Sequence, residues 1–127
     1  MKKFVFSFLM LATIVISSVS WTFASPVGGS KYGSYRLPAN MQHTFTQQFR
    51  SNEYATVTVE GDNYTDLELK VYNQYNQLVA WDYTYDKEEN VCQVTFYVPK
   101  AARGKATYKI VIVNQDNDFN DYKIWMQ

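Results

Sequence analysis

The sequence predicts an all-β protein, an antiparallel β-sandwich of about seven or eight short strands that follows a secretory leader. Apolar and polar residues alternate over much of the second half of the chain, which is the period of a strand with one buried face. Turn-forming residues separate these stretches every eight to twelve residues, as in folds built from two packed sheets. No window after the leader has the apolar spacing of an amphipathic helix.

The first 24 residues have the layout of a secretory signal peptide. Lys2 and Lys3 form a basic start, residues 4–16 form an apolar run, and "TFA" at 22–24 places small residues at the −3 and −1 positions of a cleavage site. An uncleaved anchor is the alternative, because the apolar stretch approaches the roughly 20 residues that a bilayer requires. Cleavage is favoured, since serines interrupt the run before the cleavage site. The mature protein is therefore expected to be secreted or periplasmic, with no membrane span.

Cleavage leaves 103 of the 127 residues, enough for one domain with a single core. Ten basic and twelve acidic residues remain, so the net charge is close to −2. This balance gives no reason to expect binding to nucleic acid or to an anionic membrane. Cys92 is the only cysteine, which excludes an internal disulfide.

Residues 25–41 are predicted to form an extended lead-in to the domain. They hold three of the five glycines and two of the three prolines, and they show no sustained apolar period. Tyr32, Tyr35 and Leu37 are the side chains expected to attach this segment to the domain.

The strands themselves are predicted from period-two alternation. In residues 54–63, for example, Ala55, Val57 and Val59 alternate with polar residues. Residues 107–114 are apolar and β-branched at nearly every position, which is typical of a central strand covered on both faces. The predicted strands lie in 54–63, 65–73, 91–99, 107–114 and 121–126, with weaker patterns in 42–49 and 78–85.

Several of these stretches resemble the bacterial pre-peptidase C-terminal (PPC) domain. "ATVTVEGDNYTDLELKVYNQYNQLV", "CQVTFYVPKAARGKATYKIVIVN" and "DYKI" resemble, in order, that family's paired strands, its "V-x-F-x-P … G-x-Y-x-I-x-V-x-N" run and its closing strand. The resemblance covers residues 42–127 and implies a jelly-roll β-sandwich without catalytic activity. Four positions depart from the family pattern. The family's first acidic position is Thr65 or Asp66 depending on register, and Glu68 stands where the family has a second Asp. Asn76 replaces the hairpin Gly, and the Asp/Asn run after residue 114 replaces the Gly often found there. Asn tolerates the left-handed conformation that such a turn needs.

Residues for catalysis are few. His43 is the only histidine, and Cys92 occupies an inward strand position where a buried thiol is usually inert. No motif brings the two together. A pair of carboxylates of the glycosidase kind is an alternative that the sequence alone leaves open, but the carboxylates fall in turns and on polar strand faces. The chain is accordingly expected not to be an enzyme.

The acidic segment "DNDFNDYKIWMQ" is a candidate calcium site. Asp116, Asp118 and Asn120 match the spacing of the first calcium ligands of an EF-hand, but the required Gly and Glu are replaced by Asp121 and Gln127. An EF-hand is therefore excluded. A looser calcium site would use Asp116, Asp118 and Asp121, with Asp62 or Asp66 from another turn. The favoured alternative is a polar hairpin whose side chains cap its own backbone.

The segment 72–85 is a candidate contact surface. "YNQYNQ" is the predicted turn of a hairpin, with Tyr72 and Tyr75 expected to point outward. On the returning strand, Trp81, Tyr83 and Tyr85 share one parity with Val79, and Leu78 and Ala80 share the other. Because large aromatic side chains are usually buried, Trp81 and the residues that share its parity are expected to face the core. If Leu78 and Ala80 face the core instead, an exposed aromatic strip results that suits sugar rings or a peptide.

Three functions remain open from the sequence. The leading hypothesis is an exported, non-enzymatic binding or accessory protein that contacts a glycan, a protein or the cell envelope through an aromatic surface. The second is a structural or stress-related envelope protein without a small ligand. The third is a calcium-dependent binding module.

Overall fold

The computed structural model describes residues 25–62, 66–83 and 90–127, and the predicted leader lies outside them. Within these residues the chain forms eight strands and no helix, so no segment is a candidate for a membrane-spanning helix. The strands are β1 (Lys31–Leu37), β2 (Gln42–Arg50), β3 (Glu53–Glu60), β4 (Leu67–Tyr72), β5 (Leu78–Tyr83), β6 (Val91–Val98), β7 (Lys105–Asn114) and β8 (Asn120–Met126). The prediction of an all-β sandwich is confirmed.

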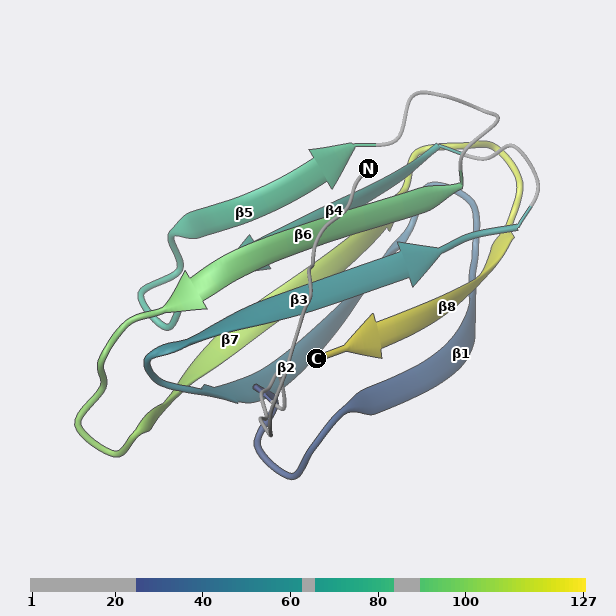
Figure 1. Cartoon of the computed structure of the whole chain (residues 1–127). Coiled ribbons are helices and arrows are strands. Elements are labelled where there is room, and N and C mark those ends of the chain that lie inside the picture. The colour runs from purple at the N-terminus through teal and green to yellow at the C-terminus, as the bar shows by residue number, and fades with distance from the viewer. Residues whose placement is uncertain (1–24, 63–65, 84–89) are drawn as a thin grey trace.

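The strands form two four-stranded antiparallel sheets that pack face to face (Figure 1). One sheet has the order β1-β8-β3-β6 and the other has the order β2-β7-β4-β5. Chain neighbours thus face each other across the sandwich: β1 and β2, β8 and β7, β3 and β4, β6 and β5. This is the strand order of a jelly roll.

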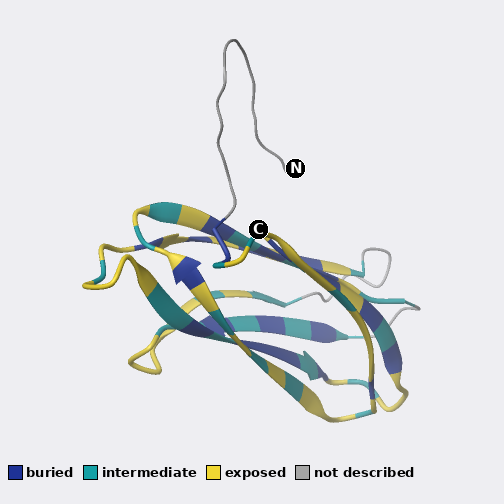
Figure 2. Ribbon diagram, turned by 90° about the horizontal axis from the view of Figure 1, so that it is seen from below, coloured by how far each residue is buried: buried dark blue, intermediate teal, exposed yellow. Residues whose placement is uncertain are grey.

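The core lies between the sheets and is built from the alternating residues that the sequence indicates (Figure 2). Phe49, Phe96 and Tyr108 form its aromatic centre, with ring centroids 4.9–5.8 Å apart. Strand β7 is central in its sheet, as predicted, and its outward-pointing Val111 is also buried. The remaining core consists of Leu37, Ala55, Val57, Val59, Leu67, Leu69, Val71, Cys92, Val94, Val98, Ile110, Ile112, Tyr122, Ile124 and Met126.

The predicted lead-in contains a strand that the sequence pattern did not reveal. β1 pairs with β8 along its whole length, from Lys31 opposite Met126 to Leu37 opposite Asn120. Leu37 is fully buried, but the other residues of its parity are Lys31, Gly33 and Tyr35, which face the open edge of the sandwich. Because this edge of the sandwich buries few side chains, β1 shows no alternation of apolar and polar residues, and the period-two pattern could not predict it.

Candidate functional site

Three of the predicted aromatic residues lie together on the outer surface of β4 and β5. Leu67, Leu69 and Val71 point into the core, so Glu68, Lys70 and Tyr72 point outward. The strand register places Trp81 opposite Lys70 and Tyr83 opposite Glu68. We call the outer surface formed by Lys70, Tyr72, Trp81 and Tyr83 the aromatic face.

The expectation that Trp81 is buried is wrong: its side chain is 56% exposed. Ala80 is the residue of β5 that packs against the core, whereas Val79 is exposed. β5 is an edge strand of its sheet, and across the sandwich it faces β6, an edge strand of the other sheet. The inward Asp82 carboxylate there accepts a hydrogen bond from the backbone N–H of Gln93 at 2.8 Å. The small Ala80 and the polar Asp82 fill the inner side of this edge, so the large aromatic residues of β5 lie on the outer surface.

Lysine side chains hold the rings of the aromatic face. The Nζ of Lys109 lies 4.8 Å from the centre of the Tyr72 ring and donates to Oδ1 of Asn76 at 3.0 Å. The Nζ of Lys70 lies 6.0 Å from the centre of the Tyr83 ring and 3.8 Å from Oε1 of Glu68. Cation–π contacts of this kind favour one position of each ring and keep ammonium groups beside it as hydrogen-bond donors. The aromatic face therefore combines flat apolar rings with charged donors.

Tyr75 stands apart from this face, at the tip of the β4–β5 hairpin, where it is 73% exposed. The predicted turn is confirmed: Oδ1 of Asn73 accepts the backbone N–H groups of Tyr75 and Gln77 at 3.0 and 2.9 Å. Asn76 adopts the left-handed conformation with φ of 61°, as expected for a residue at the position of a hairpin Gly. The fifth predicted residue, Tyr85, lies outside the described residues.

The residues of the predicted calcium site form hydrogen bonds within the β7–β8 loop and an ion pair with β1. The carboxylates of Asp116 and Asp118 accept the backbone N–H groups of Asn117 and Phe119 at 2.6 and 2.8 Å. Asp121 forms a two-point ion pair with Arg36, at 2.7 and 3.0 Å, and this pairing lowers the pKa of its carboxyl group. Across the described ranges, no three His, Cys, Asp or Glu side chains gather as metal ligands would.

Asp62 and Asp66, the two further residues considered for the calcium site, also form hydrogen bonds to this loop and to β8. Oδ1 of Asp62 accepts the backbone N–H of Asp121 at 3.1 Å, and the backbone carbonyl of Asp66 accepts the N–H of Gln115 at 2.9 Å. The interpretation of this segment as a hairpin whose Asx side chains cap its backbone agrees with the hydrogen bonds in the loop.

His43 and Cys92 lie on strands at opposite edges of the sandwich, β2 and β6. Nδ1 of His43 is 2.7 Å from the hydroxyl of Tyr122, which is buried, and burial raises the pKa of that hydroxyl well above its ordinary value. The thiol of Cys92 is buried, as predicted, and donates to the carbonyl of Leu67 at 3.5 Å. The fold therefore does not bring this histidine and this thiol together.

Sequence reasoning missed four further aromatic residues on the outer surface of the β1-β8-β3-β6 sheet, of which Tyr32, Tyr54 and Tyr97 are exposed and Trp125 is half-buried. Tyr32 and Trp125 pack with ring centroids 5.3 Å apart, and Tyr54 and Tyr97 pack with centroids 5.1 Å apart. Tyr54, Tyr97 and Trp125 each have the outward parity of their strand, next to a buried neighbour. That parity was the available signal for these three residues, whereas Tyr32 belongs to the unpredicted strand β1.

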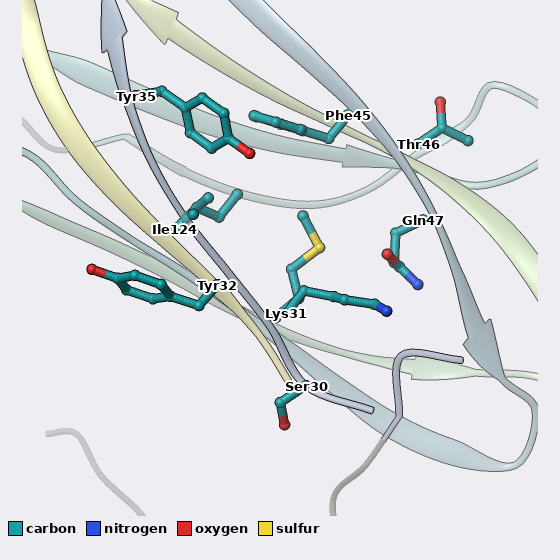
Figure 3. Close-up of a pocket in the computed structure, with 10 residues that line it drawn as sticks. Ser30, Lys31, Tyr32, Tyr35, Phe45, Thr46, Gln47 and Ile124 are labelled. Atoms are coloured by element: carbon teal, nitrogen blue, oxygen red, sulfur yellow. The ribbon is translucent and has the colours of Figure 1, made fainter. Parts of the chain in front are cut away.

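Sequence reasoning also missed a groove at the open edge between β1 and β2, shown in Figure 3. It has a volume of about 450 Å³. We call it the edge groove, and its lining residues are Ser30, Lys31, Tyr32, Gly33, Tyr35, Phe45, Thr46, Gln47, Ile124 and Met126. Its volume suits a small ligand, and it is built by β1, β2 and β8, whose sequences show no shared motif.

Neither a family model nor a curated protein matches the sequence.

Proposed function

We propose that the chain is an exported, non-enzymatic binding module that contacts a glycan of the cell envelope through the aromatic face. The proposal is carried by one observation, the 56% exposed Trp81 on the outer surface of β5, opposite Lys70 and next to Tyr83. Single exposed aromatic side chains are common on monomers, but Trp81 shares its surface with the half-buried rings of Tyr72 and Tyr83, and a contiguous apolar surface of this kind marks a contact site.

The composition of the aromatic face favours a glycan. Sugar rings present flat C–H surfaces that pack on aromatic rings, and their hydroxyl groups need donors and acceptors close to those rings. Lys70 and Lys109 supply donors, and Glu68 and Asn76 supply acceptors. The rings are preorganised because strand pairing fixes their backbone and lysine contacts restrict Tyr72 and Tyr83.

Export and the absence of catalysis belong to the same proposal. The predicted leader at residues 1–24 supports a secreted or periplasmic location. The separation of His43 from Cys92, and the engagement of Asp116, Asp118 and Asp121 in structural contacts, support a binding role over catalysis or calcium dependence. The jelly-roll strand order is also what the resemblance to the PPC domain implies, and we propose that relationship for residues 42–127.

A glycan array with matched variants tests the proposal. The wild-type protein is expected to bind a subset of envelope-type glycans. Trp81→Ala is expected to weaken that binding about two- to tenfold, since one aromatic stacking contact contributes about 0.5–1.5 kcal/mol. The matched control is Tyr54→Ala, which removes an exposed ring from the opposite sheet. A wild-type protein that binds no glycan, or equal losses in the two variants, would contradict the role of the aromatic face.

A further inference from the structure

The edge groove is a bounded site between the two sheets. β1 and β2 are the outer strands of their sheets on the same side of the sandwich. At one end, residues 25–27 cover the end of β2: the N–H of Val27 donates to the carbonyl of Gln48 at 2.9 Å, and the N–H of Arg50 donates to that of Ser25 at 2.8 Å. At the other end, Tyr35, His43 and Tyr122 close the space, with ring centroids 5.7–6.2 Å apart. A ligand would therefore meet a pocket of defined length.

The floor of the groove is apolar, whereas Ser30, Thr46 and Gln47 add polar groups to its lining. Ile124 and Met126 belong to the buried core, and Phe45 packs against it. The rings of Tyr35 and Phe45, which lie 5.1 Å apart, form one wall (Figure 3). Gly33 is needed for this wall, because a Cβ atom at that position would lie 2.5 Å from the Tyr35 ring. These surfaces favour a ligand with an apolar chain or ring.

The rim of the groove carries one charge. Lys31 is the single ionisable cation among the lining residues, and none of them is acidic. In the part of the chain that the structure describes, Lys31 takes part in no ion pair. Its Nζ lies over Gly28, where a Cβ atom would be 3.0 Å away, so the glycine leaves room for the ammonium group. Figure 3 shows the side chains of Lys31 and Gln47 at the end of the groove opposite Tyr35.

We propose that the edge groove binds an amphipathic carboxylate, with its apolar part against Phe45, Ile124 and Met126 and its carboxylate on Lys31. The volume of about 450 Å³ falls within the usual range of small-molecule sites. An acyl or aryl carboxylate matches the combination of apolar floor and single cation, because its charge meets the ammonium group at the rim and only its apolar part enters the sandwich. This site is separate from the aromatic face and does not depend on the glycan proposal.

Titration with decanoate below its micellar concentration tests the proposal, with calorimetry for affinity and NMR of the methionine methyl groups for location. Saturable 1:1 binding is expected, together with a shift of the Met126 methyl signal. Lys31→Gln should weaken the affinity about tenfold, because a charge-assisted contact contributes about 1.5 kcal/mol or more. The matched control is Lys123→Gln, an exposed lysine on the outer side of β8, and it should leave the affinity within twofold.

Two further ligands and one further variant test the charge and the location of the site. Decyltrimethylammonium has the same chain and the opposite charge and should bind at least tenfold more weakly than decanoate. Glucuronate has the charge without the apolar chain and should not compete. Trp81→Ala should leave decanoate binding unchanged, so failure of the glycan proposal would not affect this result. The proposal is overturned by absent or non-saturable decanoate binding, by Lys31→Gln binding as tightly as wild type, or by equal binding of the cationic amphiphile.

Discussion

Replacement of Asn114 by alanine tests how one buried amide holds the end of the sandwich. Asn114 ends β7 and is fully buried. Its Nδ2 lies 3.2, 3.3 and 2.8 Å from the backbone carbonyls of Leu37, Pro38 and Asp118, and its Oδ1 accepts the N–H of Asp116 at 3.0 Å. One side chain thus joins the end of β1 to the β7–β8 loop.

Asn114→Ala removes these hydrogen bonds and leaves their backbone partners without a replacement. Each such loss costs about 1 kcal/mol, and partial access of water to the loop carbonyls makes the sum smaller than strict additivity gives, so we expect a loss of about 3 kcal/mol in the free energy of unfolding. For a domain of this size the midpoint of thermal unfolding should fall by about 12–24 °C. Natural domains have about 5–15 kcal/mol of stability in all, so the variant should fold but only marginally.

Urea unfolding followed by tryptophan fluorescence measures this loss. The matched control is Asn117→Ala, because Asn117 is an exposed asparagine of the same loop whose Oδ1 accepts one long bond, 3.3 Å, from Asn40. The control should change the free energy of unfolding by less than about 0.5 kcal/mol. A loss below about 1 kcal/mol for Asn114→Ala, with an unchanged dependence on urea, would show that the buried amide does not hold the loop as described.

Three other outcomes are expected. Phe49→Ala should cost about 3–5 kcal/mol in chemical unfolding, because it leaves a cavity beside Phe96 and Tyr108, and a cost below about 2 kcal/mol would mean that the core collapses around it. Arg36→Gln should be less stable than wild type near neutral pH, because Arg36 lowers the folded-state pKa of Asp121 below its ordinary 3.8. The difference in the free energy of unfolding should be fully present above pH 3.8 and should vanish as the pH falls through the folded-state pKa of Asp121. A difference that persists in unfolding curves at about pH 2 would contradict the ion pair as its source. The Cys92 thiol should react with a disulfide reagent at least about 100-fold more slowly in the native protein than in urea, and equal rates would contradict its burial.

Most of the fold could be predicted from the sequence because the core strands bury every second side chain. Ala55, Val57 and Val59 are fully buried where the alternation placed them, and the continuous apolar run of β7 lies at the centre of its sheet. These signals are local: each strand shows its own buried face, whichever strand it pairs with.

The parity of β5 could not be predicted in this way, since both of its parities carry apolar residues. Val79 and Trp81 share one and Leu78 and Ala80 share the other. A register shift between Val71 and Tyr72 then changes which residues of β5 lie opposite β4, so that Leu78 and Trp81 both lie opposite outward residues of β4. The choice depends on the edge position of β5, which is a property of the assembled sheet.

The sequence by itself determined the strands of the core, the hairpin turn at Asn76 and the burial of Cys92, because backbone preference and alternation act over a few residues. Only the tertiary structure decided which aromatic residues are exposed, that residues 31–37 complete a sheet, and that Lys31 and Phe45 border one groove. The physical reason is that these features lie at the edges of the sandwich, where burial is partial and is set by which strands meet there.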